Sequence, residues 1–325
     1  MHGQKKAGTM TEPNENFLSD LAKQFKIASN LPASEHIKLL KKLEKLESSK
    51  LCLILNYFLT IETNQEVLAY LVKTVSKYQN DLTVDILTDM LLNMKKENSE
   101  SAAKLKSEIA VALGRSGNSS CVLALLYILN NKDENYKVRL SCAEALGRIG
   151  SSYAVTPLIE LVSDDEEKSI YLRESAAKAL GMLGDMRAIE PLVNILENRN
   201  GLFGKFTFLK ERIIETLGQL GQYGDEKSIK ALKNALEDES SVVRCGAIEA
   251  LSEIENEKVV PIIENMLADE NEDVARTAVF SLYEILGKNY IKSLLNSKTL
   301  QDCCKDEIMS ILGEDAEVEV EINDK

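Results

Sequence analysis

Apolar residues recur at three- and four-residue steps along most of the chain, which is the spacing of one face of an α-helix. Turns, several of them containing glycine, interrupt the pattern at regular intervals. Before residue 99 the pattern predicts helices near residues 15–28, 34–47, 50–61, 65–78 and 82–95. We therefore expect an all-α protein.

From residue 99 onward the pattern repeats. The tripeptide Ala-Leu-Gly occurs three times, and three variants of it follow. The central leucines are Leu113, Leu146, Leu180, Leu217, Leu251 and Leu282. They are 33, 34, 37, 34 and 31 residues apart. Intervals this similar indicate a repeat array, in which one structural unit is copied along the chain.

Each repeat contains two amphipathic segments joined by a turn. Glycine ends the first segment in three repeats, where a left-handed backbone would stop a helix, at Gly150, Gly184 and Gly221. Proline lies in the first turn of the second segment, where a missing N–H costs nothing, at Pro157, Pro191 and Pro261. Alanines near the leucine let neighbouring helices approach closely. One helix pair cannot bury its apolar faces alone, so we expect stacked pairs with a continuous core.

Two segments carry a resemblance to a known family. Leu172–Asp185, read as LRESAAKALGMLGD, followed by AIEPL at 188–192, resembles the HEAT repeat of the type first named in phycobilisome lyases. Val138-Arg139 with AEALGRIG at 143–150 is a second good copy. The resemblance covers about residues 100–296 and implies an α-solenoid, a superhelix of stacked HEAT-like helix pairs. It says little about function, because such repeats serve many unrelated tasks.

The pattern divides the chain into four parts. Residues 1–14 are polar and are expected to form a disordered leader. Residues 15–98 are an N-terminal helical region, either a cap of the array or a set of degenerate repeats. Residues 99–312 form the repeat array. Residues 313–325 are an acidic tail, for which we expect disorder, with a short added strand as the alternative.

Charge narrows the range of partners. The 325 residues are 44% hydrophobic and carry a formal net charge of −13, all of it after residue 100. Nucleic-acid binding requires an excess of Lys and Arg to neutralise phosphates, so we expect no nucleic-acid partner. A basic protein partner, or a surface that serves only solubility, fits the charge better. No apolar run approaches the length of a bilayer span, and no secretory signal is evident, so we expect a cytoplasmic protein and no membrane partner.

Catalytic chemistry has little support. His2 and His36 are the only histidines, and we expect His36 to be a solvated residue of a first helical turn. This scarcity disfavours zinc sites and histidine-activated nucleophiles. It also separates the chain from deoxyhypusine hydroxylase, whose iron site uses several His-Glu motifs. The six cysteines are expected to be reduced, and adjacent Cys303 and Cys304 are either redox-active or ordinary helix residues. We predict no catalytic residue, no cofactor and no metal.

Two columns of charge follow the repeats. Seven residues before each of the first five leucines lies the basic column, Lys106, Arg139, Arg173, Lys210 and Arg244. The HEAT resemblance implies a structural ladder, in which each cation pairs with an acid of an adjacent repeat; an anion-binding stripe is the alternative. Two residues before the leucine lies the glutamate column, Glu144, Glu215 and Glu249, interrupted by Lys178. The resemblance implies that it faces the concave surface, where it would meet a basic partner or only solvent.

The longest repeat interval contains an insertion at residues 200–208. It holds two glycines, Gly201 and Gly204, and three of the seven phenylalanines of the chain, Phe203, Phe206 and Phe208. An insertion in a repeat array forms a loop at one edge, and exposed aromatic residues are typical binding hot spots. Alternatively, Phe206 and Phe208 pack onto the next helix. Tyr223 occupies a second glycine-flanked turn.

These observations predict a non-enzymatic scaffold or adaptor that binds another protein through the concave face and the edge loops. The partner is expected to be basic or to offer an apolar pocket for an anchor. The alternative is a bilin lyase or a bilin-handling subunit, which only the repeat resemblance supports. DNA binding, known for some HEAT-like glycosylases, is disfavoured by the net charge.

Overall fold

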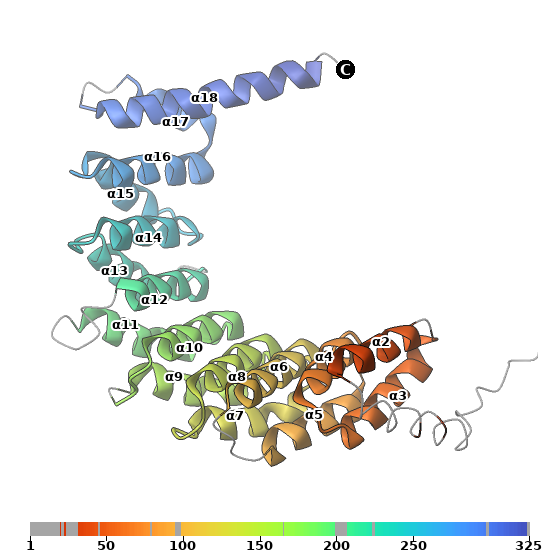
Figure 1. Ribbon diagram of the computed structural model, residues 1–325. Coiled ribbons are helices and arrows are strands. Elements are labelled where there is room, and N and C mark those ends of the chain that lie inside the picture. The colour runs from red at the N-terminus through yellow and green to blue at the C-terminus, as the bar shows by residue number, and fades with distance from the viewer. Residues whose placement is uncertain are drawn as a thin grey trace, which may run out of the picture. The chain divides into compact units, whose positions relative to one another are not determined.

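The computed structural model describes residues 20, 23, 32–44, 46–78, 80–94, 99–164, 166–198, 207–222, 225–296 and 299–323, with side chains as far as Gly313. Over these residues the chain is all-α and contains no strand. It divides into two compact units, Met1–Ile149 and Gly150–Lys325. Figure 1 shows both units with their helices labelled, and each unit is described by itself below.

The first unit consists of helices that alternate between two rows. The row of A helices is α2 (Ala33–Leu43), α4 (Gln65–Val75), α6 (Glu100–Ser116) and α8 (Tyr136–Ile149). The row of B helices is α3 (Ser48–Ile61), α5 (Asp81–Asn93) and α7 (Val122–Asn130). Each A helix packs on the next A helix, and each B helix packs on the next B helix. The helices before residue 99 therefore stack in the same order as the repeats that follow them.

The second unit has the same two-row arrangement. Its A helices are α10 (Ile170–Leu183), α12 (Thr207–Leu220), α14 (Ser241–Ser252), α16 (Glu272–Leu286) and α18 (Asp302–Asn323). Its B helices are α9 (Val155–Ser163), α11 (Ile189–Glu197), α13 (Glu226–Ala235), α15 (Val259–Glu264) and α17 (Lys288–Leu294). A helices again pack on A helices, and each B helix packs on the A helix of the next repeat. The fold is an α-solenoid of stacked helix pairs.

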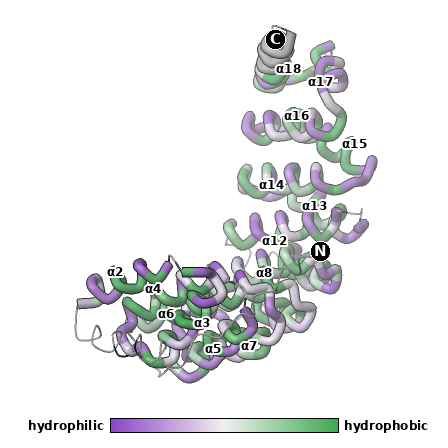
Figure 2. Tube along the Cα trace, turned by 90° about the vertical axis from the view of Figure 1, so that its right-hand side faces the viewer, coloured by the Kyte–Doolittle hydropathy of each residue, from purple (hydrophilic) through white to green (hydrophobic). Residues whose placement is uncertain are grey.

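The repeated leucine is the centre of the core. All six central leucines, from Leu113 to Leu282, are completely buried. Hydrophobic and hydrophilic turns alternate along the helices in Figure 2, as amphipathic packing requires. Most of the buried positions around these leucines are aliphatic or alanine, so the core is continuous along each unit.

The predicted turn residues are mostly confirmed. Gly150 and Gly184 adopt positive φ angles, of 75° and 65°. The prolines occupy the third position of α9, α11 and α15, within the first turn as expected. The prediction for Gly221 is wrong, since it is not among the described glycines with positive φ. A β-carbon at Gly221 would instead lie 2.8 Å from both the Leu217 carbonyl oxygen and the Ser228 Cβ, so glycine is needed there for close approach.

The helical backbone of α18 continues as far as Asn323. It thus includes most of the acidic tail, for which the sequence predicts disorder. Glutamate is a good helix former, and no proline follows Gly313, so helix is compatible with the composition of this segment. The expected leader at residues 1–14 lies outside the described residues.

Candidate partner-binding surface

The cations of the basic column lie inside the fold. Lys106, Arg139, Arg173 and Arg244 are buried, and Lys210 is half-buried. The Lys106 Nζ lies 2.7 Å from the Glu134 carboxylate, and the Lys210 Nζ lies 2.6 Å from that of Asp238. The Arg244 guanidinium binds both carboxylate oxygens of Asp269, at 2.8 and 2.9 Å.

Each of these acids immediately precedes the next A helix of its unit. Glu134 precedes α8, Asp238 precedes α14 and Asp269 precedes α16. The three ion pairs therefore tie one repeat to the next.

The arginines also bind backbone carbonyls at the end of the preceding B helix or in the loop that follows it. The Arg139 Nε donates to the Leu129 oxygen at 2.8 Å, at the carboxyl end of α7. Arg173 donates to the oxygens of Asp164 and Glu167, and Arg244 donates to that of Asp238 at 2.9 Å. Carbonyl groups at a helix carboxyl end carry partial negative charge and lack intrahelical partners, so a cation is stabilising there.

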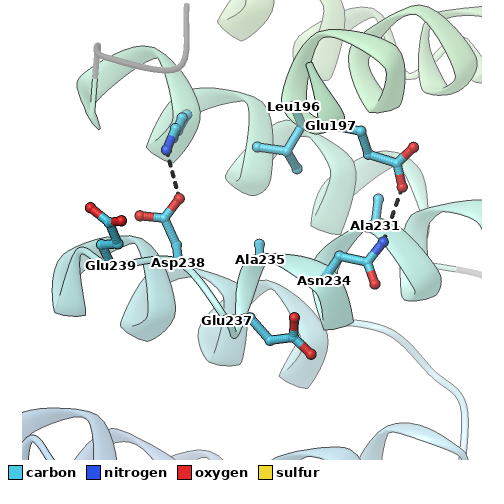
Figure 3. Close-up of a pocket in the computed structure, with 9 residues that line it drawn as sticks. Leu196, Glu197, Ala231, Asn234, Ala235, Glu237, Asp238 and Glu239 are labelled. Atoms are coloured by element: carbon cyan, nitrogen blue, oxygen red, sulfur yellow. Dashed lines mark hydrogen bonds and ion pairs between the residues drawn. The ribbon is translucent and has the colours of Figure 1, made fainter. Parts of the chain in front are cut away.

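An acidic hollow opens at the edge where α11, α12 and α13 meet the loop before α14. Its volume is about 450 Å³. Leu196, Ala231 and Ala235 give it an apolar floor, and four acids, Glu197, Glu237, Asp238 and Glu239, surround that floor (Figure 3). The connection between α11 and α12, which contains the predicted insertion, begins directly after Glu197, the last residue of α11.

Most of the negative charge of the acidic hollow is unbalanced. Asp238 is paired with Lys210, and Glu197 accepts a hydrogen bond at 3.1 Å from the Asn234 amide, as the dashed lines in Figure 3 show. Glu237 and Glu239 are exposed, and neither carboxylate forms an ion pair within the described part of the chain. The hollow thus combines apolar floor with carboxylates that remain available to a cation.

An apolar column runs beside the basic column in the second unit. Two residues before Arg173, Lys210 and Arg244 stand Tyr171, Phe208 and Val242. Their exposed fractions are 63%, 74% and 55%. Each is the second residue of its A helix, so the column follows the same edge across α10, α12 and α14.

Phe208 is the one predicted aromatic that falls within the described residues. It is exposed and does not pack onto a neighbouring helix, so that alternative is wrong for Phe208. Phe203, Phe206 and Tyr223 lie outside the described residues. Sequence reasoning missed Tyr171 and Val242, although their fixed position relative to the basic column could have revealed them.

The glutamate column is divided between the two units. Glu144 lies on α8 of the first unit, half-buried. Glu215 and Glu249 are exposed on α12 and α14 of the second unit. Burial, and then the nearby charges of Glu215 and Glu249, raise the pKa of Glu253 on the same surface. The structure therefore groups Glu215 and Glu249 with a third acid that the sequence did not single out.

Few cations balance this group of acids. Arg212 contacts Glu215 and lies 3.2 Å from the Glu174 carboxylate. Burial and the charge of Glu174 nevertheless raise the pKa of neighbouring Glu211. The exposed surface of α10, α12 and α14 is therefore acidic overall.

The sequence of this chain matches a known repeat family. The family model for HEAT repeats matches residues 96–171, 122–202 and 209–283, which together make up more than half of the chain. The chain belongs to the HEAT-repeat family. No curated protein matches it in sequence.

Several solved structures are similar to this HEAT-repeat chain. Kap95p bound to RanGDP matches with a TM-score of 0.54 and 12% identity over 85% of this chain and 44% of the matched chain. The CpcE–CpcF complex of phycocyanin lyase from Nostoc sp. PCC7120 matches with a TM-score of 0.45 and 22% identity over 70% and 94%. Human deoxyhypusine hydroxylase matches with a TM-score of 0.36 and 18% identity over 81% and 94%. At these identities the likeness concerns the fold alone.

One expectation about histidine is wrong for this HEAT-repeat chain. His36 is only 2% exposed rather than solvated, and its Nδ1 lies 3.2 Å from the Glu62 carboxylate. Burial lowers the pKa of His36, although the charge of Glu62 acts in the opposite direction. The start of α2 packs against the loop after α3, which removes this first-turn position from solvent.

The adjacent cysteines of this HEAT-repeat chain lie in its core. Cys303 and Cys304 are both buried, and burial, followed by the neighbouring Cys303, raises the pKa of Cys304 to about 12. A raised pKa disfavours the thiolate form of Cys304. No group of three His, Cys, Asp or Glu side chains in the described residues is placed to bind a metal. Among the helices described, none combines the length and apolar character needed to cross a lipid bilayer.

Proposed function

We propose that this HEAT-repeat protein is a non-catalytic scaffold whose second unit binds a basic segment of a partner protein. The observation that carries the proposal is the acidic hollow, in which an apolar floor lies beside three carboxylates, Glu197, Glu237 and Glu239, that form no ion pair with the described residues. Lys and Arg have long aliphatic stems and a charged head, so such a side chain can cover Leu196 and Ala235 while its head approaches Glu237 or Glu239.

The apolar column supplies the second part of the site. Phe208 is two residues from Lys210, which lines the acidic hollow, and its side chain is exposed. Aromatic residues dominate binding energy at protein interfaces because they bury a large area with little loss of conformational entropy. A basic segment with one apolar residue would therefore contact both features. Phe203 and Phe206 of the same insertion are proposed as further anchors.

The acidic surface favours encounter with such a partner. Glu215, Glu249 and Glu253 add negative charge on the A helices of the same unit. Attraction between oppositely charged surfaces raises association rates and selects against acidic competitors. The described residues contain no feature that favours the bilin-lyase alternative over binding.

A binding titration tests the proposal. The probe is a fluorescein-labelled peptide of alternating Lys-Lys and Leu residues, measured by fluorescence anisotropy against the full chain at physiological salt. The variant Glu197→Gln/Glu237→Gln/Glu239→Gln removes three charges from the acidic hollow. The control Glu160→Gln/Glu255→Gln/Glu257→Gln removes three exposed charges from elsewhere in the same unit.

We expect the hollow variant to bind about tenfold more weakly and the control to change by less than about twofold. Equal losses of peptide affinity in the two variants would show that only the net charge of the protein matters. That result would refute the acidic hollow as the binding site. Separately, Phe208→Ser tests the described anchor and Phe203→Ser/Phe206→Ser tests the other two, with circular dichroism as the check on folding.

A further inference from the structure

The first unit carries a hollow of opposite charge. It lies between α4 and α6 and has a volume of about 310 Å³. Val72, Val111 and Ala112 form an apolar floor, and Lys73, Lys104 and Arg115 are the cations that line it. We call this feature the basic groove.

The three cations of the basic groove are available to a ligand. All three side chains are exposed, and none forms an ion pair in the described part of the chain. One acid, Glu108, also lines the groove, so the local charge is positive even though the whole chain carries −13. Positive charge retained around an apolar floor, on an otherwise acidic protein, favours an anionic partner.

The spacing of the cations sets the length of that partner. Lys104 and Arg115 are eleven residues apart on α6, or about 16 Å along the helix axis at 1.5 Å per residue. Lys73 comes from the neighbouring helix α4. An extended peptide advances by about 3.3 Å per residue, so roughly five residues would span the distance from Lys104 to Arg115.

A buried hydroxyl in the groove lacks a partner. The Ser107 Oγ is inaccessible to solvent and forms no hydrogen bond within the described residues. Leaving a buried donor without an acceptor destabilises a fold. The Ser107 side chain lines the groove, so rotation of its hydroxyl toward the groove would let it donate to a carboxylate or carbonyl oxygen of a bound segment.

We infer that the basic groove binds an acidic segment of a partner protein, with carboxylates that meet Lys73, Lys104 and Arg115 around one aliphatic side chain on the apolar floor. The aliphatic floor offers no aromatic ring on which a nucleobase would stack, which disfavours a single-stranded nucleic acid. The site is on different helices and has the opposite charge from the acidic hollow, so it does not rest on the function proposed above.

The test uses the full chain and a peptide with fluorescein on its amino terminus, fluorescein-Glu-Glu-Leu-Glu-Asp-Leu-Glu-Glu-amide, whose binding is measured by fluorescence anisotropy. Lys73→Gln/Lys104→Gln/Arg115→Gln removes the cations of the groove. Lys41→Gln/Lys42→Gln/Lys50→Gln is the matched control, because it removes three exposed cations from other helices of the same unit. We expect binding to weaken at least about tenfold in the first variant and less than about twofold in the second.

Ser107→Ala separates a binding role from a structural one. It removes a hydroxyl that has no partner in the fold, so the melting temperature should stay the same or rise. Peptide affinity should fall about threefold if the hydroxyl donates to the ligand. Three results would overturn the inference: no binding by the wild-type chain, equal losses in both triple variants, or equally tight binding of an eight-nucleotide single-stranded DNA.

Discussion

Gly218 on α12 packs directly against Ala250 on α14. A β-carbon added to Gly218 would lie 2.9 Å from the Ala250 Cβ and 3.0 Å from its Cα. The first unit has the same relationship between Gly114 and Ala145, whose Cα would lie 2.7 Å from the added atom. In both contacts the glycine that follows the central leucine fits against the alanine that precedes the central leucine of the next A helix, which favours small residues at these two positions.

The contact predicts the sign of a glycine substitution. In a helix interior, Gly→Ala is normally stabilising by about 1 kcal/mol. At Gly218 the new methyl group would meet neighbouring backbone, so we expect Gly218→Ala to lower the free energy of unfolding by about 1–3 kcal/mol. Gly313→Ala on α18 is the control, since its added carbon would meet nothing within 4 Å. Thermal unfolding by circular dichroism checks both; equal effects would refute the packing explanation.

The Arg244–Asp269 ion pair predicts a large effect of a single charge. Both side chains are 9% exposed, and Arg244 also binds the preceding loop. Arg244→Gln removes the cation that balances the charge of the Asp269 carboxylate. We therefore expect the free energy of unfolding, measured with denaturant, to fall by about 3 kcal/mol. Lys258→Gln breaks an ion pair with Glu226 in which the two side chains are 68% and 81% exposed, so it should change stability far less than Arg244→Gln does. A loss as small as that of Lys258→Gln would show that the ladder does not hold the repeats together.

The same pair predicts a dependence on pH. Burial alone would raise the pKa of Asp269, but hydrogen bonds from Arg244 and the Asn271 backbone hold it below its usual value. A carboxyl with a depressed pKa in the fold stabilises the protein above its unfolded pKa, and this stability is lost as the pH falls through the folded pKa. The difference between wild type and Arg244→Gln should therefore shrink as the pH falls below about 4. A constant difference between pH 7 and 3 would contradict this.

His36 predicts a second titration, in the first unit. Burial lowers its pKa below 6.5, against the effect of Glu62. The folded state therefore holds the imidazole neutral while the unfolded state takes up a proton as the pH falls through 6.5. Stability should decline between pH 7 and 5, and His36→Gln should remove this decline. A proton NMR titration of the two histidines checks the midpoint, and a value for His36 above 6.5 would be inconsistent with the buried geometry.

Thiol reactivity should be confined to one of the six cysteines. Five of them are buried, and Cys245 alone is partly exposed. Burial raises the pKa of Cys121 to about 11 and also raises that of Cys142. We expect Ellman's reagent to modify about one thiol in the native protein and six after denaturation. Rapid modification of Cys303 or Cys304 would restore the redox interpretation.

The periodic features of the fold could be predicted from the sequence, because they repeat. The spacing of Leu113, Leu146 and Leu180 locates the core of each A helix, and all three are completely buried. The division at Ile149 could not be predicted, since the interval of 34 residues across it gives no sign of a boundary.

Features that depend on one spatial neighbour were missed. The burial of His36 depends on Glu62, which is 26 residues away and belongs to no motif. Gly221 is required by contact with Ser228 rather than by its own backbone angle. The acidic hollow combines Leu196 with Ala235 and Glu239, which are far apart in the repeat pattern. Tyr171 and Val242 are the exception, since their register beside the basic column was visible in the sequence.

Hydrogen–deuterium exchange with the basic Lys/Leu peptide would show where on the full chain a partner segment binds. We expect the peptide to slow exchange at residues 194–197 and 231–239, around the acidic hollow, and at the start of α12. We expect no slowing at α4 and α6 of the first unit. Protection spread evenly over the acidic surface, or no protection around the acidic hollow, would refute the proposed binding site.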